Sequence, residues 1–463
     1  MNNIYNLLAD LCSHVIKNCD ENFFVQYSCV SKSETVRLKE YVNKKIPELI
    51  IESGETFTIC QLDNSFINSE KFKLLSEVSE EFKKQNDYFS LVGFIQILDE
   101  SLETLLKEKF YELEQDSFTV VLNTNRETTG IGLLPRCSCA WERKHRLSQC
   151  YNRMDNFLFN LLLMENVILE ELIDKHIFLK QDFFKTFPQN RTLKIAATPL
   201  RLEGKYEEVY YERNKTSYLK VEYDEPESEQ DNLLIWNKIL LAQKEDSDII
   251  VFPEVLGNFK TVSFIKEKIN ALSDEEKKRL PALIILPSVW KDRKNIVTIL
   301  DRNGNTIAEQ YKQNPYRTEK IHQSYLEDII PNNVINIFHY EGIGRFAVLI
   351  CKDFLTTKYM ERLMRCFKLT LIIVPSYSSG SYDFKQSFDL CAHDDCNVIW
   401  INSCAAVEEG RERNMENIGY IRKRIGIKDD QSQTLCNMPS CQGIYNGKCN
   451  HDCIFFEEMK GVH

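Results

Sequence analysis

Three residues whose side chains could act together in acyl transfer lie at the ends of predicted strands. Glu254 follows a strand in IIVFPE, Lys312 follows a turn-and-strand unit in DRNGNTIAEQYK, and Cys351 ends a strand in GRFAVLIC. A cysteine attacks a carbonyl carbon as the thiolate, so it needs a nearby base or a field that lowers its pKa. A glutamate can take the thiol proton and later donate it to a leaving amine, and a lysine ammonium can stabilise an oxyanion. This set of residues predicts a site that forms and hydrolyses a thioester.

Strand ends must position these three side chains. Short runs rich in Ile, Val and Leu predict strands that are covered on both faces, and their alternation with helical stretches indicates a layered α/β domain over residues 191–428. In such folds reactive side chains collect at strand ends. The charged stretch 203–230 has no core pattern, so we expect a surface insertion there. The predicted strands are 193–200, 248–252, 282–286, 296–300, 345–350, 370–374 and 398–402.

Residues 191–425 resemble the nitrilase superfamily of carbon–nitrogen hydrolases, whose members use a Glu–Lys–Cys triad in this chain order. FPE at 252–254 is similar to the glutamate motif of the family. A D-x-x-G hairpin places Gly304 eight residues before Lys312, as in the lysine motif. The cysteine motif is a β-run followed by C-x-D, and here ICKD carries Cys351.

The resemblance implies a four-layer αββα sandwich and a role for each matching residue. Cys351 would be the nucleophile, Glu254 the general base and then acid, and Lys312 the group that stabilises the oxyanion. Many members add a second glutamate after the lysine, which matches Glu319, and the backbone N–H of Lys352 would also face the oxyanion. The resemblance further implies that catalysis needs no organic cofactor and that the chain forms a homodimer or larger homo-oligomer.

Departures from the family pattern bear on the substrate. The common R-K-x-H-L after the hairpin is replaced by YKQNPYR. A second alignment would use Lys320–Ile321–His322, but the glycine spacing favours Lys312. C-K-D is nearer to the amidase-like branches than to the C-W-E of true nitrilases, which favours a small-molecule amide as substrate.

Residues 1–190 predict a mostly helical domain that resembles no family we recognise. Apolar residues recur at helical spacing in 70–85, 88–114 and 154–180, and FTVVL at 118–122 predicts a strand. No residue spacing in this domain demands chemistry.

The segment 429–463 predicts a short cysteine-rich tail. Cys436, Cys441, Cys449 and Cys453 have the spacing C-x4-C-x7-C-x3-C, with His451 as a substitute ligand. Four soft ligands within a short, glycine-containing stretch suit a structural tetrahedral zinc ion. The alternative is a mobile tail of free thiols.

The charge and hydropathy of the chain bear on its binding partners and on its location in the cell. A formal net charge of -11 argues against nucleic acid bound over a broad surface. No run of eighteen apolar residues occurs, so we expect no membrane span. The start MNNIYNLLAD lacks a basic n-region and a long apolar core, which predicts a cytoplasmic location with the 16 cysteines mostly reduced or bound to metal.

A second hypothesis belongs to another functional class. The nitrilase-like domain could be catalytically idle and act in ligand sensing or scaffolding, in a bacterial defence system for example, since the Asn-, Lys- and Ile-rich composition fits an AT-rich bacterium. The large helical half and the cysteine-rich tail favour this hypothesis, whereas the intact triad disfavours it. A small electrophile trapped on Cys351 at neutral pH would favour the enzyme.

Overall fold

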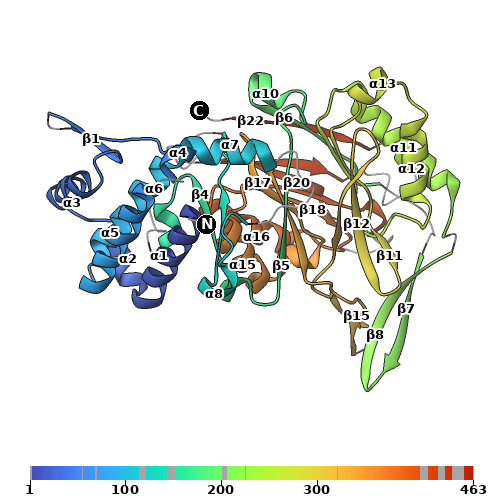
Figure 1. Cartoon of the computed structure of the whole chain (residues 1–463). Helices are drawn as coiled ribbons and strands as arrows, with labels where there is room; N and C mark the ends of the chain where they lie inside the picture. Colours follow the sequence, from blue (N-terminus) through green and yellow to red (C-terminus); the bar gives the residue numbers. More distant parts are fainter. Residues whose placement is uncertain are drawn as a thin grey trace. The chain divides into compact units, whose positions relative to one another are not determined.

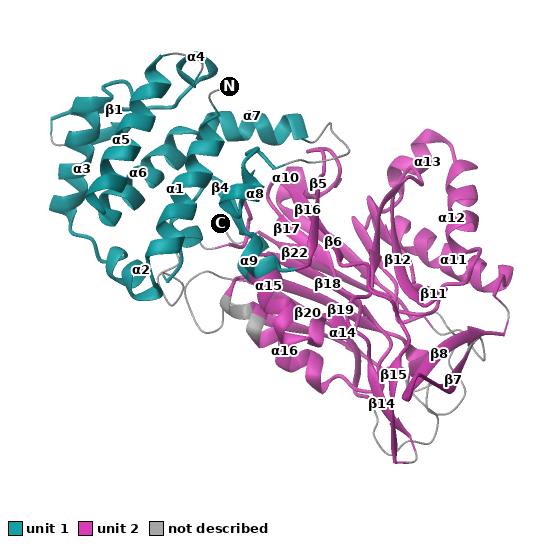
Figure 2. Cartoon of the chain, turned by 60° about the horizontal axis from the view of Figure 1, so that its bottom comes forward, with its two compact units in different colours: residues 1–137, 143–170, 365–367 teal, residues 138–142, 171–364, 368–463 magenta. Residues whose placement is uncertain are grey.

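The computed structural model divides the chain into two compact units (Figure 2). Unit 1 comprises residues 1–137, 143–170 and 365–367, and unit 2 comprises residues 138–142, 171–364 and 368–463. The structure describes residues 3–54, 56–67, 70–113, 121–142, 152–200, 206–224, 226–320, 322–406, 415–425, 433–440 and 453–461.

Helices make up most of unit 1. Apolar residues on several of them, including Leu8, Leu75 and Phe94, are buried together in one cluster. The predicted helix 70–85 is confirmed as α5, and the predicted helix 88–114 is two helices, α6 and α7. The expected strand 118–122 lies largely outside the described residues. The helices and strands up to residue 135 are α1 (Ile4–Asn18), α2 (Glu21–Tyr27), α3 (Lys32–Lys45), β1 (Ile50–Ser53), β2 (Thr56–Ile59), α4 (Asn64–Ile67), α5 (Lys71–Gln85), α6 (Tyr88–Ser101), α7 (Glu103–Leu113), α8 (Arg126–Thr129) and β3 (Ile131–Pro135).

The prediction of a long helix over 154–180 is wrong. This stretch forms the 3-10 turn η1 (Met154–Phe157), β4 (Leu161–Glu165), the single turn α9 (Asn166–Leu169) and β5 (Ile173–Phe178). β4 pairs with β3, and β5 pairs in parallel with β16 (Val334–Tyr340) of unit 2. The run 161–164 is buried without a break, and such a run looks the same in a strand and in a buried helix.

Two seven-stranded sheets form the centre of unit 2 (Figures 1 and 2). In the first, β11-β12-β10-β9-β6-β22 are neighbours in that order, and β13 pairs with β12. Its strands are β6 (Thr192–Ala197), β9 (Ile249–Val251), β10 (Leu283–Ile285), β11 (Val289–Lys291), β12 (Lys294–Asp301), β13 (Thr306–Tyr311) and β22 (Phe455–Lys460). The second sheet has the order β21-β20-β19-β18-β17-β16-β5. Its remaining strands are β17 (Gly344–Val348), β18 (Leu371–Ser376), β19 (Asn397–Asn402), β20 (Asn417–Arg424) and β21 (Gln433–Pro439).

All seven predicted strands of this region are confirmed, since they coincide with β6, β9, β10, β12, β17, β18 and β19. β6, β9 and β10 run parallel in the first sheet, and β17, β18 and β19 run parallel in the second. The carboxyl ends of parallel neighbours share one edge, so residues that follow these strands meet there.

Helices pack against both sheets. Ile235 and Ile265 share an apolar cluster with Ile250, so α11 and α12 lie on one face of the first sheet. Phe384 of α16 stacks on Trp400 of the second sheet, with ring centroids 4.7 Å apart. The remaining helices and turns of unit 2 are α10 (Phe187–Asn190), α11 (Glu229–Lys244), α12 (Thr261–Asn270), α13 (Asp274–Arg279), α14 (Lys352–Leu355), α15 (Thr357–Phe367, whose last residues belong to unit 1), α16 (Tyr382–His393) and η2 (Cys404–Ala406).

The charged stretch 203–230 supplies strands and not a featureless insertion. β7 (Tyr206–Arg213) and β8 (Thr216–Tyr223) form a hairpin that joins β14 (Arg317–Lys320) and β15 (Gln323–Glu327) in the order β14-β15-β8-β7. We call these four strands the side sheet. Figure 1 shows the β7–β8 hairpin extending away from the two large sheets of unit 2.

Among the described residues, no helix combines the length and the apolar character needed to cross a bilayer.

Candidate active site

The structure brings together the three residues predicted to form a triad. Glu254 follows β9, Lys312 follows β13, and Cys351 lies between β17 and α14. The Lys312 Nζ is 2.8 Å from Glu254 Oε1, and the Cys351 thiol lies close enough to the Glu254 carboxylate for each to influence the pKa of the other. The residues are 2%, 3% and 6% exposed, respectively, so their charges act on one another in a site from which most water is excluded.

A tight turn between β12 and β13 sets the position of Lys312. Gly304 has φ 82, which favours glycine, and the Asp301 side chain accepts hydrogen bonds from the backbone N–H groups of Asn303 and Asn305, both at 2.8 Å. This is the hairpin expected from the sequence. At the far end of the pair, the Lys312 N–H donates to the Asn295 carbonyl at 2.9 Å.

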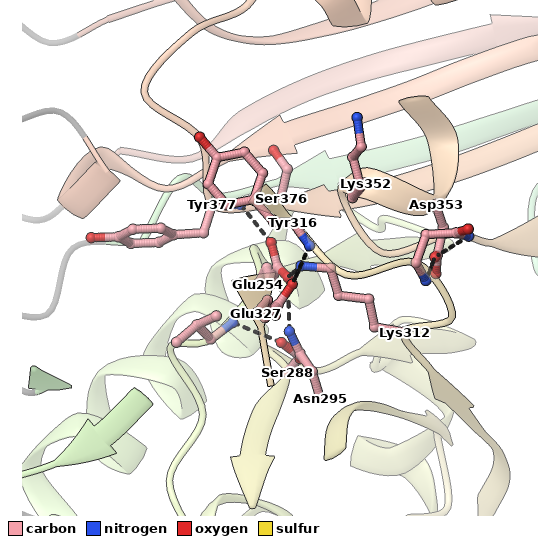
Figure 3. Close-up of polar contacts among 12 residues, drawn as sticks. Glu254, Ser288, Asn295, Lys312, Tyr316, Glu327, Lys352, Asp353, Ser376 and Tyr377 are labelled. Carbon is pink, nitrogen blue, oxygen red and sulfur yellow. Dashed lines mark hydrogen bonds and ion pairs between the residues drawn. The ribbon is translucent and has the colours of Figure 1, made fainter. Parts of the chain in front are cut away.

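Hydrogen bonds from both large sheets orient the Glu254 carboxylate (Figure 3). Asn295 of β12 donates its Nδ2–H to Oε1 at 2.8 Å, and the Tyr377 N–H, just after β18, donates to Oε2 at 3.0 Å. The Glu254 N–H itself donates to the Ser376 carbonyl at 3.3 Å. The carboxylate therefore has a fixed direction before any substrate binds.

A second glutamate contacts Lys312, and it is Glu327 and not Glu319. The Lys312 Nζ is 2.6 Å from Glu327 Oε2, which also accepts the Tyr316 N–H at 2.9 Å. The Glu319 side chain lies on β14, is 72% exposed and pairs with Arg317. The structure thus does not bring Glu319 into the cluster. Sequence reasoning missed Glu327, although an acid at the end of the alternating run QSYLE was a usable signal.

The backbone is strained beside both reactive side chains. Cys351 has φ 46 and ψ -100, and Val255, next to Glu254, has φ 71. Such values are rare for residues with a Cβ and persist only where surrounding contacts enforce them. The Val255 N–H donates to Ser288 Oγ at 2.7 Å, and its carbonyl accepts the Tyr223 hydroxyl at 3.1 Å.

The backbone N–H groups at Cys351 differ in their partners. The Cys351 N–H donates to the Pro375 carbonyl at 2.9 Å. Among the described residues, no acceptor is hydrogen-bonded to the N–H of Lys352. In Figure 3 the Lys352 side chain points away from Glu254 and Lys312.

Burial and neighbouring charges shift the pKa of each group. Burial, and then the negative Glu254, raise the pKa of the Cys351 thiol well above its usual value. Burial also raises the pKa of the Glu254 carboxyl; Glu327 adds to this rise, whereas Lys312 opposes it. Burial alone would lower the pKa of Lys312, but Glu254 and Glu327 outweigh it and raise that pKa well above its usual value. These shifts favour the protonated form of the Cys351 thiol and the charged form of Lys312, and they make the Glu254 carboxylate a stronger base than an exposed glutamate.

No protein-family model matches the chain, and no curated protein matches it. In structure it is similar to glutamine-dependent NAD+ synthetase from Acinetobacter baumannii, with 14% identity and a TM-score of 0.40 over 59% of this chain and 48% of that chain. It is also similar to C. elegans NitFhit, with 15% identity and a TM-score of 0.35 over 58% of this chain and 61% of that chain. An amidase of the nitrilase superfamily from Nesterenkonia sp. AN1, in complex with butyramide, gives 15% identity and a TM-score of 0.31 over 46% of this chain and 77% of that chain.

The chain spans about half the length of the NAD+ synthetase and less than two thirds of NitFhit. Likeness at such identities concerns the fold and not the activity.

Asp353 fixes the chain next to Lys312 of the candidate site. Its carboxylate accepts the Gln313 N–H at 3.0 Å, the Asn314 N–H at 2.7 Å and Asn314 Nδ2–H at 2.9 Å. Burial raises the pKa of Asp353 to about 7, although these hydrogen bonds and Lys312 act in the opposite direction. The aspartate of the C-x-D motif thus has a structural explanation in the loop that follows β13.

The cysteines predicted to bind zinc are only partly described. Cys436 lies in β21, and its thiol is close to Lys423 and Glu457. Cys453 lies just before β22, whereas Cys441 and Cys449 are outside the described residues. Within the part of the chain that the structure describes, no three His, Cys, Asp or Glu side chains are arranged to hold a metal ion. The four-cysteine site therefore stays a prediction.

Proposed function

We propose that this chain hydrolyses a non-peptide C–N bond, in a small-molecule amide, through a thioester on Cys351. The observation that supports the proposal is a buried cluster. In it, Lys312 lies 2.8 Å from Glu254 and 2.6 Å from Glu327, and the buried Cys351 thiol lies beside Glu254. We further propose that the two large sheets and their helices form the four-layer αββα sandwich of the nitrilase superfamily.

The first step is attack on the amide carbonyl. Glu254 accepts the thiol proton as the Cys351 Sγ–C bond forms, and the carbonyl π pair moves to oxygen. A positioned general base of this kind accelerates such a step by about 10²- to 10⁴-fold. The Lys312 ammonium and the N–H of Lys352 are the groups proposed to stabilise the oxyanion.

The second step is collapse of the tetrahedral intermediate. The carbonyl re-forms and the C–N bond breaks. Glu254 gives its proton to the nitrogen, which leaves as ammonia or an amine. Water then attacks the thioester and loses a proton to Glu254, the C–S bond breaks, and the thiolate recovers the proton from Glu254. The cycle ends with a carboxylic acid as product and needs no redox partner.

The contact with Glu327 keeps Lys312 charged during the cycle. Lys312 pairs with two carboxylates, and one of them, Glu254, becomes neutral whenever it holds the transferred proton. Glu327 then remains as a counter-ion, so the lysine does not lose its proton to the nascent amine.

Release of ammonia from a panel of small aliphatic and aromatic amides tests the proposal. We expect the wild-type chain to release ammonia from at least one amide and the Cys351→Ala variant to release none. Cys396→Ala is the matched control, because Cys396 is also fully buried in unit 2 but lies at the opposite end of the parallel strands. Equal rates for the wild type and Cys351→Ala would refute the assignment.

A further inference from the structure

A second buried carboxylate lies directly after Glu327. Asp328 is 2% exposed and accepts two hydrogen bonds from the Arg213 guanidinium, at 2.9 and 2.6 Å. Arg293 Nη2 is 2.8 Å from the same carboxylate, and the Tyr211 hydroxyl donates to it as well. We call these four residues the Asp328 clamp.

The clamp joins three separate segments of unit 2. Arg213 and Tyr211 belong to β7, Asp328 follows β15, and Arg293 lies in the turn between β11 and β12. The Asp328 N–H also donates to the Leu219 carbonyl of β8 at 2.8 Å. Bidentate Arg–carboxylate pairs are among the stronger hydrogen-bonded contacts, and here the carboxylate is buried while the Arg213 side chain is 35% exposed. The hairpin β7–β8 is therefore anchored to the segment that carries Glu327.

The side chains of Glu327 and Asp328 point to opposite faces of one extended segment. Successive side chains of a strand point to opposite faces. Glu327 therefore contacts Lys312, while Asp328 contacts Arg213. The Glu327 N–H donates to the Tyr316 carbonyl at 2.8 Å, which completes the attachment. A rotation of this segment that released Asp328 would also move the Glu327 carboxylate away from Lys312.

We propose that Asp328 is a positioning residue that acts through Glu327: the clamp on the side sheet holds Glu327 against Lys312. The inference rests on the proposed function. The charged stretch 203–230 then has a structural role: from outside the two large sheets, it holds Glu327 in position beside Lys312.

Loss of the clamp has a defined electrostatic consequence. The charged or titratable groups that act on Glu254 are Lys312, Glu327 and Cys351. Glu254 in turn acts on Tyr223. Glu327 raises the pKa of Glu254 and Lys312 lowers it, so displacement of Glu327 lowers the pKa of Glu254. Glu254 then becomes a weaker base that is ionised at lower pH.

The experiment measures the rate at which iodoacetamide alkylates Cys351, as a function of pH, by mass spectrometry of the peptide that contains Cys351. Asp328→Asn removes the charge and keeps the shape. We expect its highest alkylation rate to fall about tenfold, as for a misplaced reacting group, and the acidic limb of its pH profile to move to lower pH. Asp395→Asn is the matched control: Asp395 also forms a buried ion pair with an arginine of unit 2, but precedes β19 at the opposite end of the sheet. Its alkylation profile should equal that of the wild type.

A second variant keeps the test decisive if Asp328→Asn does not fold. Arg213→Met removes the bidentate partner but leaves Arg293 and Tyr211 on Asp328, so the same two changes should appear with a smaller size. If Cys351 of the wild type reacts but the folded variants keep its profile, Asp328 has no positioning role and the proposed function stands. If Cys351 of the wild type does not react at any pH, the proposed function itself fails.

Discussion

Replacement of Lys312 by Met removes the only cation in contact with Glu254 and Glu327 among the described residues. Both carboxylates are buried, at 2% and 6% exposure, so neither is neutralised by solvent. Removal of one partner from a buried ion pair costs about 3–5 kcal/mol, because an uncompensated charge is left in the interior. We expect Lys312→Met to lose free energy of unfolding at the upper end of that range at pH 8, since two carboxylates share the lost cation.

The sign of the pH dependence follows from the carboxylates that remain. In Lys312→Met, burial and the nearby Glu327 raise the folded-state pKa of Glu254 above its unfolded value, and Lys312 no longer opposes this rise. The folded variant then favours the protonated form of Glu254. Its deficit relative to the wild type is therefore smallest near the unfolded pKa of glutamate, about 4, and grows as the pH rises through the raised pKa of Glu254.

Tryptophan fluorescence during urea unfolding reports on the relevant unit, because Trp141, Trp236, Trp290 and Trp400 all belong to unit 2. The midpoint of unfolding should fall more at pH 8 than at pH 5. Lys194→Met serves as control, since the structure gives Lys194 no ion pair among the described residues. Two results would contradict this account of the ion pairs between Lys312 and the carboxylates of Glu254 and Glu327. In one, the midpoint of Lys312→Met equals that of the wild type at pH 8; in the other, it is displaced equally at both pH values.

Two further predictions concern groups around the triad. Because burial raises the folded-state pKa of Asp353 to about 7, above its unfolded value, the stability from this group is fully present below the unfolded pKa and is lost as the pH rises through about 7. Asp353→Asn should therefore show a smaller decrease in the free energy of unfolding between pH 5 and pH 8 than the wild type, by an amount on the order of a few kcal/mol. An equal decrease, measured by urea unfolding, would mean that Asp353 does not titrate in this window. If Cys436, Cys441, Cys449 and Cys453 bind zinc as we propose, elemental analysis of purified protein should find zinc in the wild type and much less in Cys436→Ser, with Cys396→Ser as control. A wild-type chain free of zinc would refute the zinc site.

The triad was predictable because each residue follows a strand that its own neighbours define. Runs such as IIVF and FAVLI are apolar and short, so their ends can be read from the sequence. The rule that parallel strands share one edge does not extend to this site, because β9 and β17 lie in different sheets and β13 runs antiparallel to β12. Local pattern therefore predicts that each residue follows a strand, whereas the expectation that the three residues meet came from the resemblance to the nitrilase superfamily.

Glu327 was not predictable in the same way. The hairpin β14–β15 separates it from Lys312, and the length of an exposed hairpin follows no strict rule. Spacing alone favours Glu319, but that residue lies on the solvent-exposed part of the same hairpin. The partner that fixes Glu327 is β8, about a hundred residues earlier in the chain, and such non-local pairing leaves no local signal.

Burial on both faces explains the other error in the fold. β4 and its neighbours were predicted to be helical because an unbroken apolar run lacks the alternation of a half-exposed strand. In contrast, β7 and β8 are so exposed and charged that they show no core pattern, and their strand character depends on β15. Extreme burial and extreme exposure both remove the periodicity on which prediction depends.

The two described strands near residues 433–460 have a consequence for the order of folding. β21 is an edge strand of one large sheet, and β22 pairs with β6 at the edge of the other, more than 250 residues away. During synthesis on the ribosome, β6 emerges long before its partner exists, and its open edge can pair with other chains in the meantime. The first sheet is complete only after translation has passed Lys460, so premature termination shortly before that point should yield an aggregation-prone product instead of a slightly shortened folded chain.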